Sequence, residues 1–344
     1  MSPSPAAPRP TLRTAPLSPG SQIVGTGHYR PERVMTNQDL EQLVETNDEW
    51  IRQRTGIESR RIAAAGEGVP EMAAAAARAA LADAGVDPSE VTQIIVATCS
   101  NEERSPSAAG RVAQALGIPA PAAFEVGAAC SGFEHALAVA DMSIRTGASS
   151  VSLVIGAEKL SAFTDYTDRT TCILTADGAG AMLLRASEEP GIAPVVWGTE
   201  PELADAVTIN AVTTNAVTTN ADAAGEGPYF AQQGRQVLGW ALREAPGIAR
   251  RIVEAAGLGI EDIDVFVPHQ ANLRMIEPLA AALGLREDAV VADDIITSGN
   301  TSAATIPLAI SRLREAGRIP AGATALLIGF GGGFAWAGQV VRLP

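Results

Sequence analysis

The stretch "ALADAGVDPSEVTQIIVAT" (80–98) has a weak echo far along the chain in "IVEAAGLGIEDIDVFVPH" (252–269). Both stretches have the pattern of an alanine-rich helix, a glycine turn, an acidic linker and a buried strand. Gly85 and Gly257 mark the turn in each copy and lie 172 residues apart. A repeat of this length predicts that the chain contains two copies of one folding unit.

A second pair of similar stretches follows the first at nearly the same spacing. "ACSGFEHALAVADMSIRTG" (129–147) is similar to "GNTSAATIPLAISRLREAG" (299–317), because both have small residues, an amphipathic helix and a final glycine. A buried strand is expected after each, over 150–156 and 324–330. Strands that alternate with helices in this way predict an α/β fold with buried, mostly parallel or mixed sheets.

The limits of the two halves follow from this repeat. The first 21 residues are rich in Pro, Ser and Ala and lack the apolar core of a signal peptide, so 1–21 are expected to be a disordered tail. We place the two pseudo-symmetric halves at 22–190 and 191–344. Within the second half, "NAVTTNAVTTNA" (210–221) is a tandem pentapeptide repeat and is expected to form a surface loop.

The composition excludes several classes of protein. The chain has 344 residues, of which 47% are hydrophobic and 19% charged, as in a soluble protein of two domain-sized units. Its formal charge of −14 argues against a general nucleic-acid binder, which needs a dense basic face. No apolar run approaches the roughly 18 residues of a membrane span. We therefore expect a cytoplasmic protein without a membrane partner.

The cysteines and histidines are too few for a metal centre or a disulfide framework. The three cysteines are widely spaced, and there are only three histidines. Cys99 and Cys172 are interpreted as structural. His135 lies five residues after Cys130, a spacing that points it away from the thiol on a helix, so it is interpreted as a packing residue.

Cys130 stands where a helix is expected to begin. Beyond it, Phe133, Leu137, Ala140 and Ile144 recur at spacings of three and four, which is typical of a buried helical face. Unpaired N–H groups and a partial positive charge at a helix start favour the thiolate. Cys130 is therefore a candidate nucleophile.

The repeat brings two further residues into the argument. An offset of 170 residues, taken from the glycines at 147 and 317, carries Cys130 onto Asn300, and His269 ends the buried strand of the second copy. If the halves pack about a pseudo-twofold axis, all three residues meet in one pocket. His269 and Asn300 can both donate hydrogen bonds to one oxygen and so stabilise an enolate. A small polar residue at a helix start is otherwise most often a simple cap.

With these residues and motifs in place, the chain resembles β-ketoacyl-acyl-carrier-protein synthase III, a condensing enzyme of the thiolase superfamily. The resemblance covers 22–344 and rests on "GTGHYRPERVMTN", "TNDEWIRQRTGI", "GAACSGF", "TDRTTCILTADGAGA", "VPHQANLRMI", "GNTSAAT" and "FGGGFAWAG". It implies a five-layered αβαβα thiolase-like fold, a homodimer, and Cys130, His269 and Asn300 as a catalytic triad. It also implies that an acyl group from acyl-CoA is loaded on Cys130 and condensed with malonyl-acyl-carrier protein, with release of CO2, to initiate fatty-acid or polyketide synthesis. No cofactor is implied, because acyl-CoA is a substrate.

The resemblance also assigns binding residues. The coenzyme A and pantetheine site would comprise Thr46, Trp50, Arg54, Arg169, Gly234, Ala271 and Asn272. Arg274 would lie on the acyl-carrier docking face, and the amide of Gly332 would complete an oxyanion hole with that of Cys130. Without the resemblance, Trp50 could equally be a core residue and Arg54 a surface charge.

Several departures from the family pattern, Ser105 and Leu238 among them, leave the starter acyl group open. Ser105 and Leu238 stand where the family usually carries aromatic residues around the acyl pocket, Ser105 reaching it across the dimer. One alternative function is an acyltransferase that moves the acyl group to an alcohol or amine, which would not need Asn300. A second is an idle acyl-carrier-binding subunit, which would need none of the triad.

Overall fold

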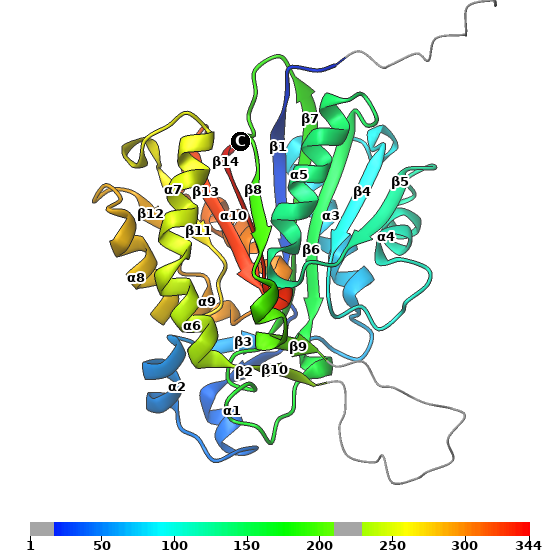
Figure 1. The fold of residues 1–344 in the computed structure, drawn as a ribbon. Coiled ribbons are helices and arrows are strands. Elements are labelled where there is room, and N and C mark those ends of the chain that lie inside the picture. Colours follow the sequence, from blue (N-terminus) through cyan, green and yellow to red (C-terminus); the bar gives the residue numbers. More distant parts are fainter. Residues whose placement is uncertain (1–16, 210–228) are drawn as a thin grey trace, which may run out of the picture.

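Two five-stranded mixed sheets with the same strand plan form the centre of the molecule (Figure 1). The structure is a computed structural model, and it describes residues 17–209 and 229–344. The first sheet has the order β5-β4-β6-β7-β1 and the second has β12-β11-β13-β14-β8. In both, the second strand of this order runs parallel to its two neighbours and the remaining pairs are antiparallel. The predicted α/β fold of two pseudo-symmetric halves is confirmed.

The elements have the following bounds. The strands are β1 Gly20–Tyr29, β2 Val34–Thr36, β3 Ser59–Arg61, β4 Gln93–Ala97, β5 Ala122–Val126, β6 Val151–Lys159, β7 Asp177–Ser187, β8 Val196–Thr199, β9 Val207–Ile209, β10 Phe230–Gln232, β11 Val265–Pro268, β12 Val290–Val291, β13 Thr324–Gly331 and β14 Ala335–Arg342. The helices are α1 Asn37–Glu41, α2 Asp48–Thr55, α3 Val69–Ala84, α4 Ala108–Leu116, α5 Gly132–Arg145, α6 Gly234–Arg243, α7 Ala245–Ala255, α8 Leu273–Leu283, α9 Ile295–Ser298 and α10 Thr305–Glu315. Three short 3-10 turns adjoin the inner helices and the end of β13, namely η2 Ala129–Ser131, η6 Ser302–Ala304 and η7 Gly332–Phe334.

The ends of the predicted segments can be compared with these bounds. β1 begins at Gly20, and Ser21 is fully buried, so ordered structure starts slightly before the expected boundary at 22. Most of the predicted tail, and the predicted loop over 210–221, lie outside the described residues.

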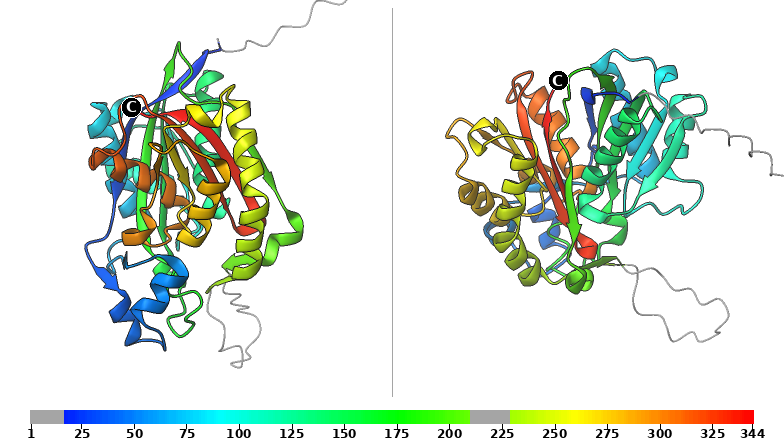
Figure 2. Two further views of the ribbon diagram at one scale, coloured as in Figure 1. Left: turned by 90° about the vertical axis from the view of Figure 1, so that its left-hand side faces the viewer. Right: turned by 45° about the horizontal axis from the view of Figure 1, so that its top comes forward.

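Side-chain alternation on the strands produces five layers (Figures 1 and 2). In β4, Ile95 packs with the central helices α5 and α10, whereas its neighbours Ile94 and Val96 pack with α3 and α4 on the outer face. In β11, Val267 likewise faces the central helices and Phe266 faces the outer helices α6, α7 and α8. Because successive strand residues point to opposite faces, each sheet is covered by helices on both sides.

A small cap covers one end of the sheets. It consists of α1, α2 and the β2–β3 ribbon, and Figure 2 (left) shows it at the lower end of the molecule. Its core contains Leu40, Ile51 and Ile57 and continues into Cys172 and Ile276 of the main body. The cap therefore holds α2 at a fixed place next to the second half.

Two strand glycines let the inner helix α10 lie directly on the first sheet. A Cβ at Gly180 would stand 2.3 Å from the backbone nitrogen of Leu308, and one at Gly156 would stand 2.3 Å from the carbonyl oxygen of Ala303. Any side chain larger than the hydrogen of glycine is excluded at both positions, because the obstructing atoms belong to the backbone and cannot rotate away.

We expect Gly180→Ala to destabilise the fold, because the new methyl group must push α10 away from the sheet. The free energy of unfolding should fall by about 1–3 kcal/mol or more, measured by denaturant unfolding. The matched control is Gly110→Ala in α4, where the nearest atom, Ser107 Oγ, is 3.5 Å from the new Cβ. Equal stability of the two variants would contradict the close approach of α10.

Candidate active site

Cys130 sits in the short turn that joins β5 to the central helix α5. It belongs to η2, and its side chain is 7% exposed. Ala129 before it has a left-handed φ of 44°, which L-residues seldom adopt. This turn presents the thiol at the start of α5, as the sequence predicts, and the helical face over Phe133, Leu137 and Ile144 is fully buried.

The matching turn in the second half is η6, and it corrects the predicted alignment. η6 leads into α10 as η2 leads into α5, and Ser302 has a φ of 46°, nearly that of Ala129. Ala129 therefore matches Ser302 at an offset of 173 residues, and Cys130 matches Ala303. The predicted offset of 170 was wrong, since Asn300 does not lie in a matching helix turn but precedes it.

Asn300 is nevertheless held rigidly beside that turn. Its amide donates to the carbonyl of Leu174 at 2.9 Å, and its carbonyl accepts from the amide of Ala176 at 2.9 Å. Its side-chain Oδ1 accepts from the amide of Ser302 at 2.8 Å. Because Oδ1 is used in this way, Nδ2 is the arm of the side chain that remains to donate.

His269 follows β11 and is buried against the second sheet. Its amide donates to the carbonyl of Ile328 at 2.8 Å, and its Nδ1 lies 2.8 Å from Thr305 Oγ1. Its ring meets Phe330 edge to face at 6.0 Å between centroids. Burial lowers the pKa of His269 to about 3, so the imidazole is neutral at physiological pH.

Ser302 and Thr305 connect the three candidate residues. The Ser302 side chain acts to lower the pKa of the Cys130 thiol, and its amide donates to Asn300 Oδ1 at 2.8 Å. Thr305 Oγ1 donates to the Ser302 carbonyl at 2.9 Å and contacts His269. The structure therefore brings Cys130, His269 and Asn300 together around one turn, η6.

The glycine run after β13 closes over the thiol. A Cβ at Gly331 would stand 2.8 Å from Cys130 Sγ, so only glycine leaves the sulfur its space. The amides of Gly332 and of Cys130 itself act to lower the pKa of the thiol. The predicted oxyanion hole consists of these two amides.

Burial dominates the electrostatics of Cys130. Desolvation raises the pKa of the thiol to about 11, and the nearby Glu158 carboxylate acts in the same direction, while hydrogen bonds from Ser302, Gly332 and Cys130 oppose them. The helix start predicted a thiol that ionises more readily than usual. The prediction missed the burial, which outweighs the local donors.

We expect alkylation of Cys130 by iodoacetamide to keep accelerating as the pH rises from 7 to 10. The thiolate is the reactive form, and a pKa near 11 leaves its fraction growing throughout this range. Peptide mass mapping would give the rate at Cys130, with a free thiol peptide as reference. A plateau below pH 9 would contradict the raised pKa.

The cap brings most of the predicted coenzyme A residues to one surface. Trp50 in α2 is half-buried, and the guanidinium groups of Arg54 and Arg169 lie 5.6 Å and 5.1 Å from its ring centroid. Arg169 also donates to the carbonyl of Glu45 at 3.2 Å. Thr46 precedes α2, and its buried Oγ1 has no hydrogen-bond partner among the described residues.

The start of α8 is tied to the same surface. Asn272 caps α8 through the amide of Arg274 and donates to the carbonyl of Arg54 at 3.1 Å. Ala271 beside it is half-buried and Arg274 is exposed. A Cβ at Gly56, at the end of α2, would stand 2.2 Å from Leu273, so α2 and α8 are packed tightly.

The remaining predicted positions lie on α6 and in the loop before α4. Gly234 is exposed at the start of α6, and Leu238 in the same helix packs on the second-half core. Ser105 is exposed, in the loop before α4.

Comparisons with known proteins now decide the family. Residues 124–201 match the 3-oxoacyl-[acyl-carrier-protein (ACP)] synthase III family, and residues 253–343 match the family described as the C terminal of the same synthase. β-Ketoacyl-[acyl-carrier-protein] synthase III 4 of Streptomyces coelicolor is 51% identical over 94% of this chain and 99% of its own length. Synthase III 2 of Streptomyces avermitilis is 52% identical over the same shares of each. The chain belongs to the 3-oxoacyl-[acyl-carrier-protein] synthase III family.

Solved structures agree with this assignment. The priming β-ketosynthase from the R1128 polyketide biosynthetic pathway has a TM-score of 0.93 and 39% identity, covering 97% of this chain and 99% of that one. The synthase III of Aquifex aeolicus VF5 has a TM-score of 0.86 and 38% identity, covering 94% of this chain and 100% of that one. The predicted family, the thiolase-like fold and the assignment as a condensing enzyme are confirmed.

Several residues of this synthase site were missed by sequence reasoning. Buried Glu158 accepts from Thr98 Oγ1 and the amide of Cys99, both at 3.1 Å. Cys99, predicted to be only structural, lies 3.6 Å from Ser302 Oγ and so borders the site. Ser302 and Thr305 stand within the quoted motif "GNTSAAT", which was the available signal. His135 packs as predicted, stacked on Trp197 at 5.5 Å.

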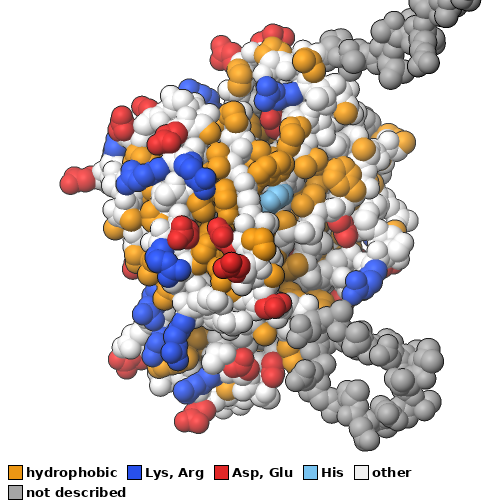
Figure 3. Space-filling model, in the orientation of Figure 1, with side chains coloured by type: hydrophobic (Ala, Val, Ile, Leu, Met, Phe, Trp, Pro, Cys, Tyr) orange, Lys and Arg blue, Asp and Glu red, His pale blue; other side chains and the backbone are white. Residues whose placement is uncertain are grey.

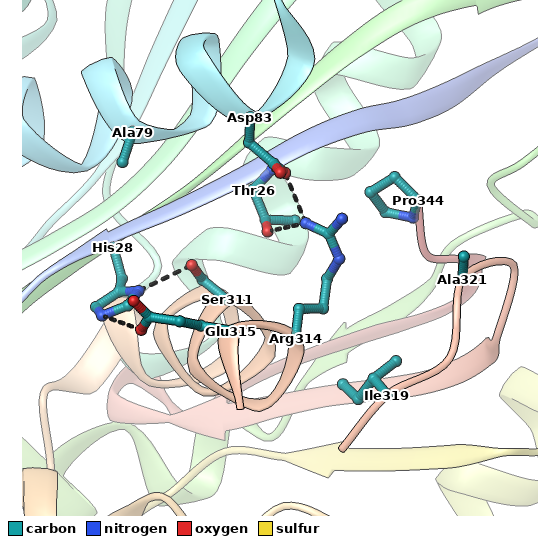
Figure 4. A pocket seen from close by; sticks show the side chains of 10 residues that line it. All are labelled: Thr26, His28, Ala79, Asp83, Ser311, Arg314, Glu315, Ile319, Ala321 and Pro344. Atoms are coloured by element: carbon teal, nitrogen blue, oxygen red, sulfur yellow. Dashed lines mark hydrogen bonds and ion pairs between the residues drawn. The ribbon is translucent and has the colours of Figure 1, made fainter. Parts of the chain in front are cut away.

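A pocket of about 560 Å³ lies away from the synthase site (Figure 4). It opens between β1, α3 and α10, and its charged groups are paired with one another. Arg314 donates to Asp83 at 2.6 Å, and His28 lies 3.7 Å from Glu315. This pocket contains none of the candidate catalytic residues.

Within residues 17–209 and 229–344, no helix is long and apolar enough to cross a membrane. No group of three or more His, Cys, Asp or Glu side chains in the same ranges is arranged to hold a metal ion.

Proposed function

We propose that this synthase transfers an acyl group from acyl-CoA to Cys130 and then condenses it with malonyl-acyl-carrier protein, to start a fatty-acid or polyketide chain. The observation that carries the proposal is the convergence of Cys130, His269 and Asn300 on the turn η6. Two halves related by pseudo-symmetry supply the nucleophile on one side and the two polar partners on the other.

Acylation takes place on Cys130. The Cys130 sulfur attacks the thioester carbonyl of acyl-CoA, and the amides of Cys130 and Gly332 bind the oxygen that becomes negative. The Cys130–acyl bond forms as the bond to the coenzyme A sulfur breaks. No cofactor takes part, because one thioester replaces another.

Condensation uses the second half. The malonyl thioester loses CO2, and the resulting enolate oxygen accepts hydrogen bonds from Asn300 Nδ2 and His269 Nε2. The enolate carbon then attacks the acyl carbonyl, the bond between this carbonyl and the Cys130 sulfur breaks, and Cys130 is released as a thiolate. The fixed Oδ1 of Asn300 supports this role, because it aims Nδ2 in advance.

The approach of the substrates follows from the cap. The Trp50 ring, Arg54 and Arg169 suit the adenine and phosphates of coenzyme A, because a flat aromatic base can stack on a ring and guanidinium groups bind phosphate. Thr46, Gly234, Ala271 and Asn272 would complete the binding path. Arg274 is exposed beside that path, where it can meet an acidic carrier protein. Both substrates and the three free cysteines suit the cytoplasm.

We expect Asn300→Ala to separate the two half-reactions. Acylation of Cys130 by acyl-CoA should continue, while decarboxylation of the malonyl thioester should fall on the order of 10²-fold, because one oxyanion donor is lost. Intact-mass spectrometry measures the first step and CO2 release the second. Thr301→Ala is the matched control, because Thr301 is next in sequence and its buried hydroxyl has no hydrogen-bond partner among the described residues. Full condensation by Asn300→Ala would exclude the role given to it and favour a plain acyltransferase.

A homodimer is the second part of the proposal. β5 is an edge strand, and Phe124, Met142 and Trp197 on β5, α5 and β8 are 36%, 41% and 44% exposed. Figure 3 shows hydrophobic side chains gathered where α5 and β8 face the viewer. A second copy would pair with the edge strand and bury this face. It would also let Ser105 of one copy reach the acyl pocket of the other, where Ser105 and Leu238 would leave room for larger starters.

We expect Phe124→Glu to weaken the dimer, because a charge is placed on the face that the second copy buries. Sedimentation should show monomer at concentrations where the unaltered protein is dimeric. Leu43→Glu is the matched control, since Leu43 is 52% exposed on the distant cap. A dimer that tolerates Phe124→Glu but not Leu43→Glu would place the interface elsewhere.

A further inference from the structure

Thr305 makes two hydrogen bonds through a single hydroxyl at the start of α10. Its Oγ1 lies 2.9 Å from the Ser302 carbonyl oxygen and 2.8 Å from His269 Nδ1. Thr305 is 2% exposed, so water does not compete for either contact.

The hydroxyl of Thr305 donates to the Ser302 carbonyl, and this direction determines what its contact with His269 Nδ1 requires. A hydroxyl carries one proton, and a carbonyl oxygen can only accept, so the Thr305 proton is used on Ser302. The second bond then needs a proton from His269 Nδ1. Since the buried imidazole is neutral, Nε2 carries none and keeps its lone pair.

We propose that Thr305 is a positioning residue that holds His269 in its Nδ1–H tautomer, so that Nε2 is the base that takes the proton of Cys130 during acylation. This inference rests on the proposed function, because it deepens the role of His269 in the first half-reaction. The hydroxyl sets the tautomer without bringing a second carboxyl group into a site that already contains buried Glu158.

The state of the thiol explains why a base is needed. Burial raises the pKa of Cys130 to about 11, so the thiol stays protonated at neutral pH. Glu158 and the Cys99 thiol are the titratable groups beside it, and Glu158 already accepts several hydrogen bonds. Phe330 touches the His269 ring, and the adjoining Gly331 touches Cys130, so both reacting groups share one wall of the site.

The protons balance over both half-reactions. In acylation, Cys130 gives its proton to Nε2, the sulfur–acyl bond forms, and coenzyme A leaves as a thiolate. The protonated Nε2 then donates to the enolate oxygen formed when malonyl loses CO2. When the enolate carbon displaces Cys130, the thiolate takes the proton back, and His269 returns to the Nδ1–H form. Thr305 accepts from Nδ1 throughout.

Nitrogen NMR of the unmodified protein tests the tautomer directly. The chain has only three histidines, and His135 is an internal reference because its Nδ1 faces the Ser131 carbonyl at 2.8 Å and must donate. With ¹⁵N-labelled histidine at pH 8, His269 should show the same protonated Nδ1 as His135. A proton found on Nε2 of His269 in the free enzyme would overturn the proposal.

Variants test the role of the hydroxyl. Thr305→Val keeps the shape but removes the acceptor, so the His269 proton should move to Nε2 and acylation of Cys130 should slow roughly tenfold or more. Thr305→Ser retains the hydroxyl, so it should keep the nitrogen spectrum of His269 and acylate Cys130 within about threefold of the original rate. Ser311→Ala is the matched control, because Ser311 is also on α10 and holds His28 Nδ1 at 2.9 Å, away from the site.

The outcomes separate this inference from the proposed function. An unchanged His269 spectrum, or an unchanged acylation rate, in folded Thr305→Val would overturn it. If Thr305→Val does not fold, the proposal is tested by the His269 spectrum of the unaltered protein and by the acylation rate of Thr305→Ser. A slow Thr305→Ser enzyme would contradict the role given to the hydroxyl. If the unmodified protein forms no acyl adduct on Cys130, the proposed function fails, whereas the spectrum still decides the tautomer.

Discussion

Direct contact between helix backbone and sheet backbone is the constraint on which the whole structure depends. The starts of α5 and α10 are pressed onto strands at positions where only hydrogen fits as a side chain, as at Gly156 and Gly331. A methyl group at either place would move a turn that carries a functional group. The same close packing that forms the core therefore sets the position of Cys130 and of η6, and the site needs no separate scaffold.

Polar groups within this tight core have to be satisfied internally, and Ser302 does most of this work. Its side chain acts on the Cys130 thiol, its amide donates to Asn300 Oδ1, and its carbonyl accepts from Thr305 Oγ1. Such a linked set resists partial rearrangement, because moving one member leaves buried donors or acceptors without partners. The arrangement is thus prepared before substrate arrives, which is the condition for electrostatic stabilisation of a developing charge.

The sequence predicted the framework well and the details of the site less well. The repeat and the motifs were enough for the two halves, the strands β6 and β13, and the three residues that meet at η6. The offset failed because it was taken from the glycines that end the helices, whereas the left-handed residues Ala129 and Ser302 define the true correspondence. Burial of Cys130 and the contact of Cys99 with Ser302 depend on packing between distant segments, which no local pattern records.

The two inner turns share a backbone shape but not a register of side chains. Ala129 and Ser302 occupy equivalent left-handed positions in the two turns. In the first turn the thiol belongs to the next residue, Cys130, whereas in the second turn the hydroxyl belongs to the left-handed residue itself, Ser302. A perfectly two-fold centre would set like against like, thiol facing thiol, and neither could polarise the other. Because the two functional groups differ by one position, the Ser302 hydroxyl faces the Cys130 thiol across the pseudo-twofold axis. The duplicated fold therefore carries an active site that is not itself symmetric.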